Sequence, residues 1–146
     1  MRIIPAIMIW AAACSIADAQ VRTKIPGGTV VLQPGYLVAT TSKTGAVFER
    51  ADHDEPLFES QVGASVAPRL TDKNIEQCRW SRKTEIQGRK VLMGIWKEDD
   101  IVTVTIFGKS GVDRFKSANF FGEFDRVEEV GDVILTALSF EPVAAP

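Results

Sequence analysis

The clearest pattern in the chain is an alternation of hydrophobic and polar side chains that predicts three β-strands joined by tight turns. The segment 78–86 has a polar residue at every odd-numbered position, and a period of two indicates a strand with one buried face. Gln87-Gly88 supplies a turn, since glycine adopts a positive φ at no steric cost. The largely apolar runs 89–96 and 101–107 predict the second and third strands.

Pairing these strands around their turns sorts their side chains into two faces, because successive residues of a strand point to opposite sides. The rows predicted for the core face are Trp80, Ile95 and Val102; Arg82, Met93 and Val104; and Thr84, Val91 and Ile106. The rows predicted for the other, mixed face are Arg79, Trp96 and Ile101; Ser81, Gly94 and Thr103; Lys83, Leu92 and Thr105; and Glu85, Lys90 and Phe107. Cys78 is in phase with Trp80, so it is also predicted to point into the core.

Strand candidates recur about every 8–12 residues along the rest of the chain, with turn residues between them. They are 29–33, 36–41, 46–50, 57–62, 124–130 and 133–140, with Gly131-Asp132 as the last turn. A helix stays open as an alternative at 124–130 and, less favoured, at 133–140. The pattern predicts an all-β single domain, an antiparallel sandwich or small barrel built around the meander of about residues 77–107, with at most one short helix.

The first 19 residues have the composition of a cleaved secretory signal peptide. Met1-Arg2 is a short positive region, Ile3–Ala13 is apolar, and Ala17-Asp18-Ala19 matches a small-residue cleavage site. The apolar run is shorter than the ~20 residues that a membrane-spanning helix needs. We therefore predict a periplasmic or secreted protein with no transmembrane span after signal removal. Residues 20–141 would form the single β domain and 142–146 a flexible tail.

Lipidation of Cys14 is an alternative for this region. Residues 11–14 resemble a bacterial lipobox, except that Ala11 replaces the usual leucine three residues before the cysteine. The protein would then be a lipid-anchored subunit of an envelope assembly. In either mature form Cys78 is the one cysteine left to pair, so we expect no intrachain disulfide.

Composition gives little guidance to function, but the charge is uneven. The 146 residues are 45% hydrophobic and 25% charged with a net charge of −2, which is ordinary for one globular domain and gives no argument for nucleic-acid binding. Residues 69–90 contain seven basic and three acidic residues, whereas 123–141 contain six acidic and one basic residue. Residues 49–59 contain five acidic and one basic residue.

Cys78 and His53 are the candidates for nucleophilic catalysis, with Asp52 or Asp54 available to orient the histidine. His53 falls in an acidic loop, however, while Cys78 is predicted to be buried, as many free cysteines are. The run 52–55 contains metal-ligand residue types, but its spacing does not match an EF-hand loop and no second histidine or cysteine lies nearby. The sequence therefore predicts no catalytic residue, no metal site and no cofactor.

The mixed face of the meander is the predicted binding surface. Its candidate contact residues are Arg79, Lys83, Leu92 and Trp96, because arginine and aromatic side chains are enriched at protein interfaces. The alternative is that a second β-layer covers Trp96, Leu92 and Phe107.

These observations predict a non-catalytic binding module rather than an enzyme. Such a protein would be an inhibitor, an immunity-type protein or an accessory protein that contacts a protein partner in the bacterial cell envelope or outside the cell. The alternative is a small periplasmic enzyme that uses Cys78 or the loop of Asp52, His53 and Asp54. A further alternative is the lipoprotein subunit that a lipidated Cys14 would give.

Overall fold

The structure, a computed structural model, describes residues 22–53 and 57–143. Its strands are β1 (Thr23–Ile25), β2 (Gly28–Val30), β3 (Tyr36–Thr41), β4 (Gly45–Arg50), β5 (Phe58–Gly63), β6 (Cys78–Ile86), β7 (Arg89–Trp96), β8 (Ile101–Phe107), β9 (Ser117–Glu123) and β10 (Glu141–Pro142). Its helices are the short 3₁₀ turn η1 (Ile75–Gln77) and the α-helix α2 (Val127–Leu138). The predicted signal peptide with Cys14, and Asp54 of the acidic loop, lie outside the described residues.

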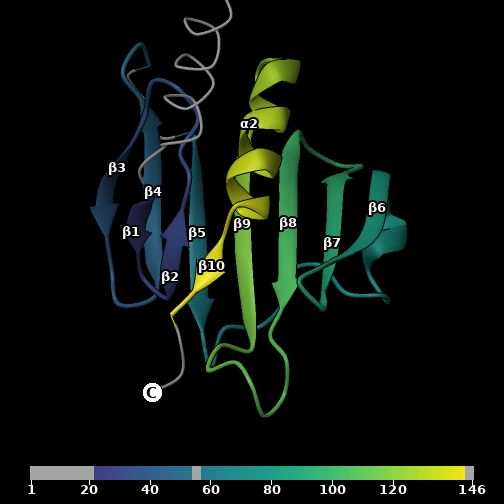
Figure 1. The fold of residues 1–146 in the computed structure, drawn as a ribbon. Helices are drawn as coiled ribbons and strands as arrows, with labels where there is room; N and C mark the ends of the chain where they lie inside the picture. The colour runs from purple at the N-terminus through teal and green to yellow at the C-terminus, as the bar shows by residue number, and fades with distance from the viewer. Residues whose placement is uncertain (1–21, 54–56, 144–146) are drawn as a thin grey trace, which may run out of the picture.

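Seven strands form one antiparallel sheet in the order β3-β4-β5-β9-β8-β7-β6, and β1, β2 and β10 form a second, three-stranded sheet. Helix α2 and the small sheet cover the same face of the large sheet (Figure 1). The protein is therefore a small, mostly β, sandwich-like domain, which confirms the predicted fold class. Among the described residues, no helix is long and apolar enough to cross a membrane.

The main core lies between the large sheet and the layer formed by α2 and the small sheet. Phe48 and Phe58 stack with their ring centroids 4.4 Å apart, and Phe120 of β9 is fully buried. Helix α2 contributes Val133 and Ala137, which lie one turn apart on its buried side. Burial of this apolar surface is the main force that holds the helix against the sheet.

The predicted register of the β6–β8 meander is confirmed over most of its length. Arg82 pairs with Met93, and Met93 pairs with Val104. The turn Gln87-Gly88 has a positive φ at both residues, 53° and 74°, as a two-residue hairpin loop of this kind requires. Trp80 lies on the predicted face but is 39% exposed, so the outer end of that face is open to solvent.

The predicted orientation of Cys78 is wrong, because β6 has an irregular register at Arg79. Cys78 pairs with Trp96 and Trp80 pairs with Ile95, which leaves Arg79 as an extra residue and shifts the alternation by one position. Cys78 therefore points away from the main core into a second cluster on the opposite face of the sheet. The buried members of that cluster are Leu70, Ile75, Cys78 and Leu92, with Trp96 and Phe107 packed against them.

The strands predicted at 124–130 and 133–140 are replaced by α2. The Glu129 carboxylate accepts hydrogen bonds from the backbone N–H groups of Asp125 (3.0 Å) and Arg126 (2.9 Å), which satisfies two donors at the start of the helix. Gly131-Asp132 lies inside this helix instead of forming a turn. The helix that the sequence left as an alternative is therefore the correct assignment.

Candidate functional site

Part of the predicted binding surface is buried beneath another segment of the chain. Leu92 is 0% exposed and packs with Leu70 and Ile75, so its assignment as a binding residue is corrected: its side chain cannot reach a partner. Trp96 is half-buried against the same cluster, and its indole N–H donates to the hydroxyl of Thr103 (3.0 Å). The covering layer is not a second β-sheet. It is residues 64–77, which we call the roof segment.

Buried polar side chains of β8 and β9 hold the roof segment against the sheet. The side-chain carbonyl of Asn119 accepts a hydrogen bond from the backbone N–H of Arg69 (3.0 Å), and its amide donates to the carbonyl of Ala67 (3.0 Å). The Thr105 hydroxyl accepts a hydrogen bond from the backbone N–H of Leu70 (3.0 Å). The roof segment is therefore anchored by its backbone, which keeps Leu92 covered.

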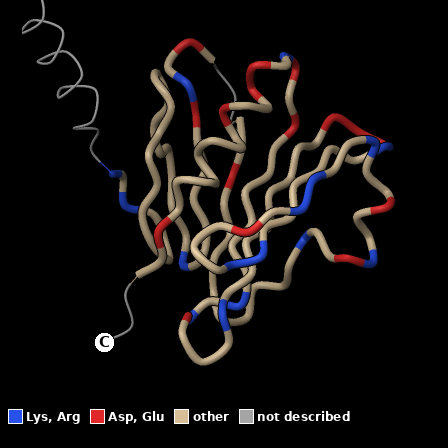
Figure 2. Tube along the Cα trace, turned by 45° about the vertical axis from the view of Figure 1, so that its right-hand side comes forward, with Lys and Arg blue, Asp and Glu red and all other residues tan. Residues whose placement is uncertain are grey.

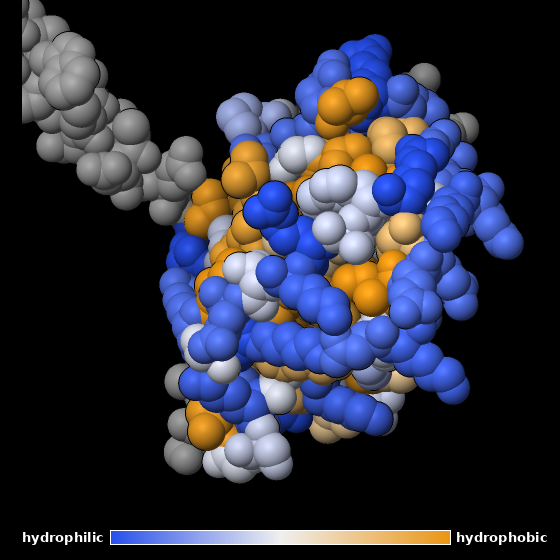
Figure 3. Space-filling model, turned by 90° about the vertical axis from the view of Figure 1, so that its right-hand side faces the viewer, coloured by the Kyte–Doolittle hydropathy of each residue, from blue (hydrophilic) through white to orange (hydrophobic). Residues whose placement is uncertain are grey.

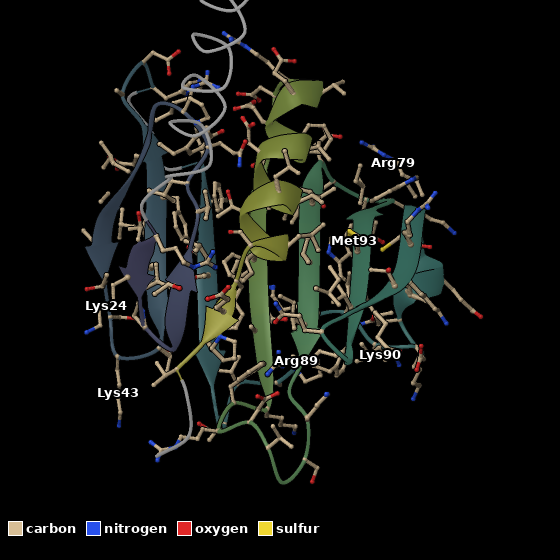
Figure 4. The ribbon with its side chains drawn as sticks, in the orientation of Figure 1. Lys24, Lys43, Arg79, Arg89, Lys90 and Met93 are labelled. Atoms are coloured by element: carbon tan, nitrogen blue, oxygen red, sulfur yellow. The ribbon has the colours of Figure 1, made fainter. Side chains whose placement is uncertain are left out.

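Arg79 and Lys83 lie on the edge strand β6, and each pairs with a carboxylate. Arg79 Nη2 lies 2.8 Å from Asp100 Oδ1, and Lys83 Nζ lies 3.1 Å from Asp72 Oδ1. Lys90 also pairs with Asp72, and the hydrogen bonds from Lys90 and Lys83 lower the pKa of that carboxyl. Figure 4 shows Arg79 of β6 and Lys90 of β7 at opposite ends of this strand pair. The four predicted contact residues therefore do not form one continuous exposed surface.

Cys78 and His53 are too far apart to act together. His53 follows β4 and Cys78 begins β6, and five strand spacings separate these strands in the sheet, a distance of roughly 24 Å. Cys78 is 9% exposed, and burial raises the pKa of its thiol. A raised pKa lowers the fraction of reactive thiolate at neutral pH. The geometry therefore gives no support to a cysteine–histidine pair.

Thiol labelling measures how well Cys78 is buried. With Cys14 replaced by serine, we expect a maleimide at neutral pH to modify the native protein at least about 100-fold more slowly than the urea-unfolded protein, because modification requires local opening. The rate of modification is followed by intact mass. Equal rates in the two states would show that the thiol is accessible, and Cys78 would again be a candidate nucleophile.

An apolar groove lies on the helix-covered face of the large sheet, between α2 and strands β6 and β7. Its volume is about 520 Å³. The residues that line it are Arg79, Trp80, Ile95, Phe124, Val127, Val130, Gly131 and Ile134. Helix α2 packs on β8 and β9, so it leaves the neighbouring part of the sheet without a helix. Figure 3 shows apolar side chains exposed among hydrophilic ones on the side of the molecule that carries β6.

The exposed side of α2 extends this apolar surface. The exposed helix positions are Val127, Glu128, Gly131 and Leu135, and Glu128 alone among them is polar. Val127 is 81% exposed and Leu135 is 54% exposed. We call the groove together with Val127, Gly131 and Leu135 the α2 face. Sequence reasoning missed this surface, although the spacing of Val127, Gly131 and Ile134 is that of one side of a helix.

The two borders of the α2 face carry opposite charges. On the sheet side Arg79 and Arg82 are exposed, and within the described part of the chain Arg82 has no ion-pair partner. On the helix side lie Glu128 and Asp132, and Asp132 accepts a hydrogen bond from the Tyr36 hydroxyl (2.8 Å). Burial and this contact raise the pKa of Tyr36. Figure 2 shows acidic positions gathered at the end of the molecule where α2 begins.

The α2 face is open and shallow, with an aromatic and two arginine side chains along one border. Pockets for small molecules enclose most of the ligand surface, whereas aromatic and arginine side chains around an apolar centre are typical of protein interfaces. The arrangement therefore suits contact with a polypeptide. No protein family, curated protein or solved structure matches this chain.

Proposed function

We propose that the protein is an exported, non-catalytic binding module that contacts a protein partner in the cell envelope or outside the cell through the α2 face. It would act there as an inhibitor, an immunity-type protein or an accessory protein. Export follows from the signal-peptide pattern of residues 1–19, and the bacterial periplasm is the compartment that fits it best. A lipidated Cys14 would place the same domain on a membrane as the subunit of an envelope assembly.

The observation that carries this proposal is the apolar exposed side of α2. A helix on the surface of a domain normally turns its apolar stripe to the core and its polar residues to water. Here Val127 and Leu135 are largely exposed, and Val127 lines the apolar groove. Contiguous apolar surface of this kind marks an interaction site in soluble proteins.

The edges of the α2 face support contact with a protein. Trp80 is partly exposed beside Arg79 at the groove, and tryptophan and arginine are the residues that most often dominate binding energy at interfaces. Of the residues proposed from the sequence, Arg79 therefore belongs to this surface. Lys83 and Trp96 lie on the opposite face of the sheet, with the roof segment.

Substitution of Val127 by aspartate is the direct test. Because Val127 is the first residue of α2, a carboxylate there interacts favourably with the helix dipole and the fold is expected to persist. A charge on this apolar surface should weaken binding at least about 100-fold, since it would be buried without a partner. The measurement is capture of envelope proteins by the tagged wild-type and variant proteins, with quantitative mass spectrometry.

Val112→Asp is the matched control, because Val112 is 59% exposed in the loop between β8 and β9, away from the α2 face. We expect one set of proteins to be captured by the wild type and by Val112→Asp but not by Val127→Asp. Equal capture by both variants would contradict the proposed use of the α2 face.

A further inference from the structure

The α2 face has room for one more helix. Helix α2 lies over β8 and β9. Beside it the ends of β6 and β7 at Trp80 and Ile95 are open on this face, whereas Val91 and Met93 of β7 are buried in the main core. Two strands are about 10 Å wide, which is about the diameter of an α-helix with its side chains. A second helix laid against this opening would therefore fill the groove.

Gly131 allows a close approach to α2 at this place. A glycine inside a helix destabilises it relative to alanine, and Gly131 does not have a positive φ that would require a glycine. A Cβ atom added there would meet nothing within 4 Å, so packing inside the described chain does not explain the residue. The missing side chain leaves a gap beside Val127 and Ile134, where a neighbouring helix can come near.

The charges at the borders identify the chemistry of the incoming helix. Arg79 lines the groove but is paired with Asp100. Arg82, two residues from Trp80 on the same face of β6, has no ion-pair partner in the described part of the chain, so a helix that fills the groove needs an apolar side flanked by a carboxylate. Helix α2 itself has these properties: it has the exposed carboxylate of Glu128, no basic residue, and an exposed apolar side. One surface of the chain thus carries both complementary halves, which is the condition for contact between identical copies across a two-fold axis.

We infer that the partner of the α2 face is a second copy of this chain, packed so that α2 of each copy lies in the groove of the other. The inference rests on the proposed function, because it assigns an occupant to the same surface. In this arrangement Glu128 of one copy faces Arg82 of the other, twice in each dimer. Val127, Gly131 and Leu135 then leave the solvent.

The size of the surface predicts a weak dimer. Helix α2 has 12 residues, so the contact is about 18 Å long and, with the open ends of β6 and β7 beside it, about 20 Å wide. That contact buries roughly 700 Å² over the two copies, which is below the size of standard specific complexes, so we expect weak association, with a dissociation constant of tens of micromolar or above. The dimer should therefore form and dissociate within concentrations that can be measured.

Sedimentation equilibrium of the protein as cells produce it from the full chain tests the inference. Between about 1 and 300 μM, a range that brackets weak dimers, the mass should rise from that of one chain to that of two. Val127→Asp should weaken the dimer at least about 100-fold, whereas Val112→Asp should not change it. Arg82→Glu and Glu128→Arg should each weaken it at least about tenfold, because like charges then face each other.

Mixing the two charge variants makes the test specific. Arg82→Glu carries two acidic groups at the contact and Glu128→Arg carries two basic groups, so the mixed dimer has opposite charges at both positions. We expect the mixture to dimerise within about threefold of the wild type. A dimer that Val127→Asp and the charge variants leave intact would place self-association elsewhere and overturn the inference.

The outcomes also separate this inference from the proposed function. A protein that is monomeric at every concentration, yet loses its captured proteins with Val127→Asp, would overturn the second-copy inference and leave the proposed function standing. A monomer whose captured proteins are unaffected by Val127→Asp would overturn both.

Discussion

Replacing Leu92 by alanine is expected to lower the free energy of unfolding by about 3–4 kcal/mol. Leu92 is fully buried in the second cluster with Leu70 and Ile75, so the change removes apolar contacts and leaves a cavity between the sheet and the roof segment. The roof is fixed by backbone hydrogen bonds to Thr105 and Asn119, which limits how far it can collapse into the space. Urea unfolding followed by tryptophan fluorescence measures the change.

The matched control is Leu37→Ala. Leu37 lies on the edge strand β3 and is 43% exposed, so the same chemical change should cost less than about 1 kcal/mol. The slope of the urea transition should be the same for both variants, since the surface exposed on unfolding hardly changes. A loss below about 1 kcal/mol for Leu92→Ala would mean that the roof segment does not cover the residue and would return Leu92 to the candidate binding surface.

The meander could be predicted because its alternation and its turn agree. Gln87-Gly88 fixes the loop, and a one-residue slip would move Met93 and Val104 from the core to the opposite face. The predicted row of Arg82, Met93 and Val104 is the one found: Arg82 pairs with Met93, and Met93 pairs with Val104. Arg82 was the one charged residue on the predicted core face, and its position on the edge strand leaves its side chain exposed.

The irregularity at Arg79 could not be predicted from the alternation. A single extra residue changes which face Cys78 occupies, yet it leaves the polar and apolar pattern almost unaltered because cysteine suits either environment. Gly94 gives a physical reason for the arrangement, since a Cβ atom there would lie 2.6 Å from the Cys78 sulfur. Burial of Cys78 was thus predicted correctly, but its neighbours were not.

The assignment of the α2 residues to strands is the larger error of prediction, and it concealed the candidate site. The run 133–140 contains Val133, Ile134 and Thr136, residue types that favour strands, and Gly131 resembles a turn residue. In the fold the burial of Val133 and Ala137 against the sheet outweighs these local preferences. The α2 face consists mainly of helix residues. If these residues formed a strand, alternate side chains would point to opposite sides of the sheet, so the strand assignment did not bring them together on one surface.

The presence of the charged residues Arg79 and Lys83 has a second physical explanation, because both lie on an edge strand. An exposed edge offers unpaired backbone groups to other strands, and proteins protect such edges with bulges and charged side chains. Strand β6 has both, an irregular register at Arg79 and basic side chains at Arg82 and Lys83. The edge is therefore protected against strand pairing, which favours contact through the α2 face over addition of a partner strand to β6.

Substitution of Asn119 by alanine is expected to lower the free energy of unfolding by about 3–4 kcal/mol. Asn119 is 0% exposed, and its side chain is bonded to the backbone of Ala67 and Arg69 and to the Thr105 hydroxyl. Alanine would leave the Ala67 carbonyl and the Arg69 N–H without these bonds beneath the roof segment, at roughly 1–3 kcal/mol each. Urea unfolding again supplies the measurement.

A second measurement separates loosening of the roof from global destabilisation. If Asn119 holds the roof segment over the second cluster, Cys78 should react with a maleimide at least about tenfold faster in Asn119→Ala than in a variant destabilised equally in the main core, because the roof opens locally. Val104→Ala suits this comparison, since Val104 is fully buried on the opposite face of the sheet. Equal labelling rates in the two variants would contradict a local role for Asn119, because thiol exposure would then follow unfolding of the whole domain and not opening of the roof.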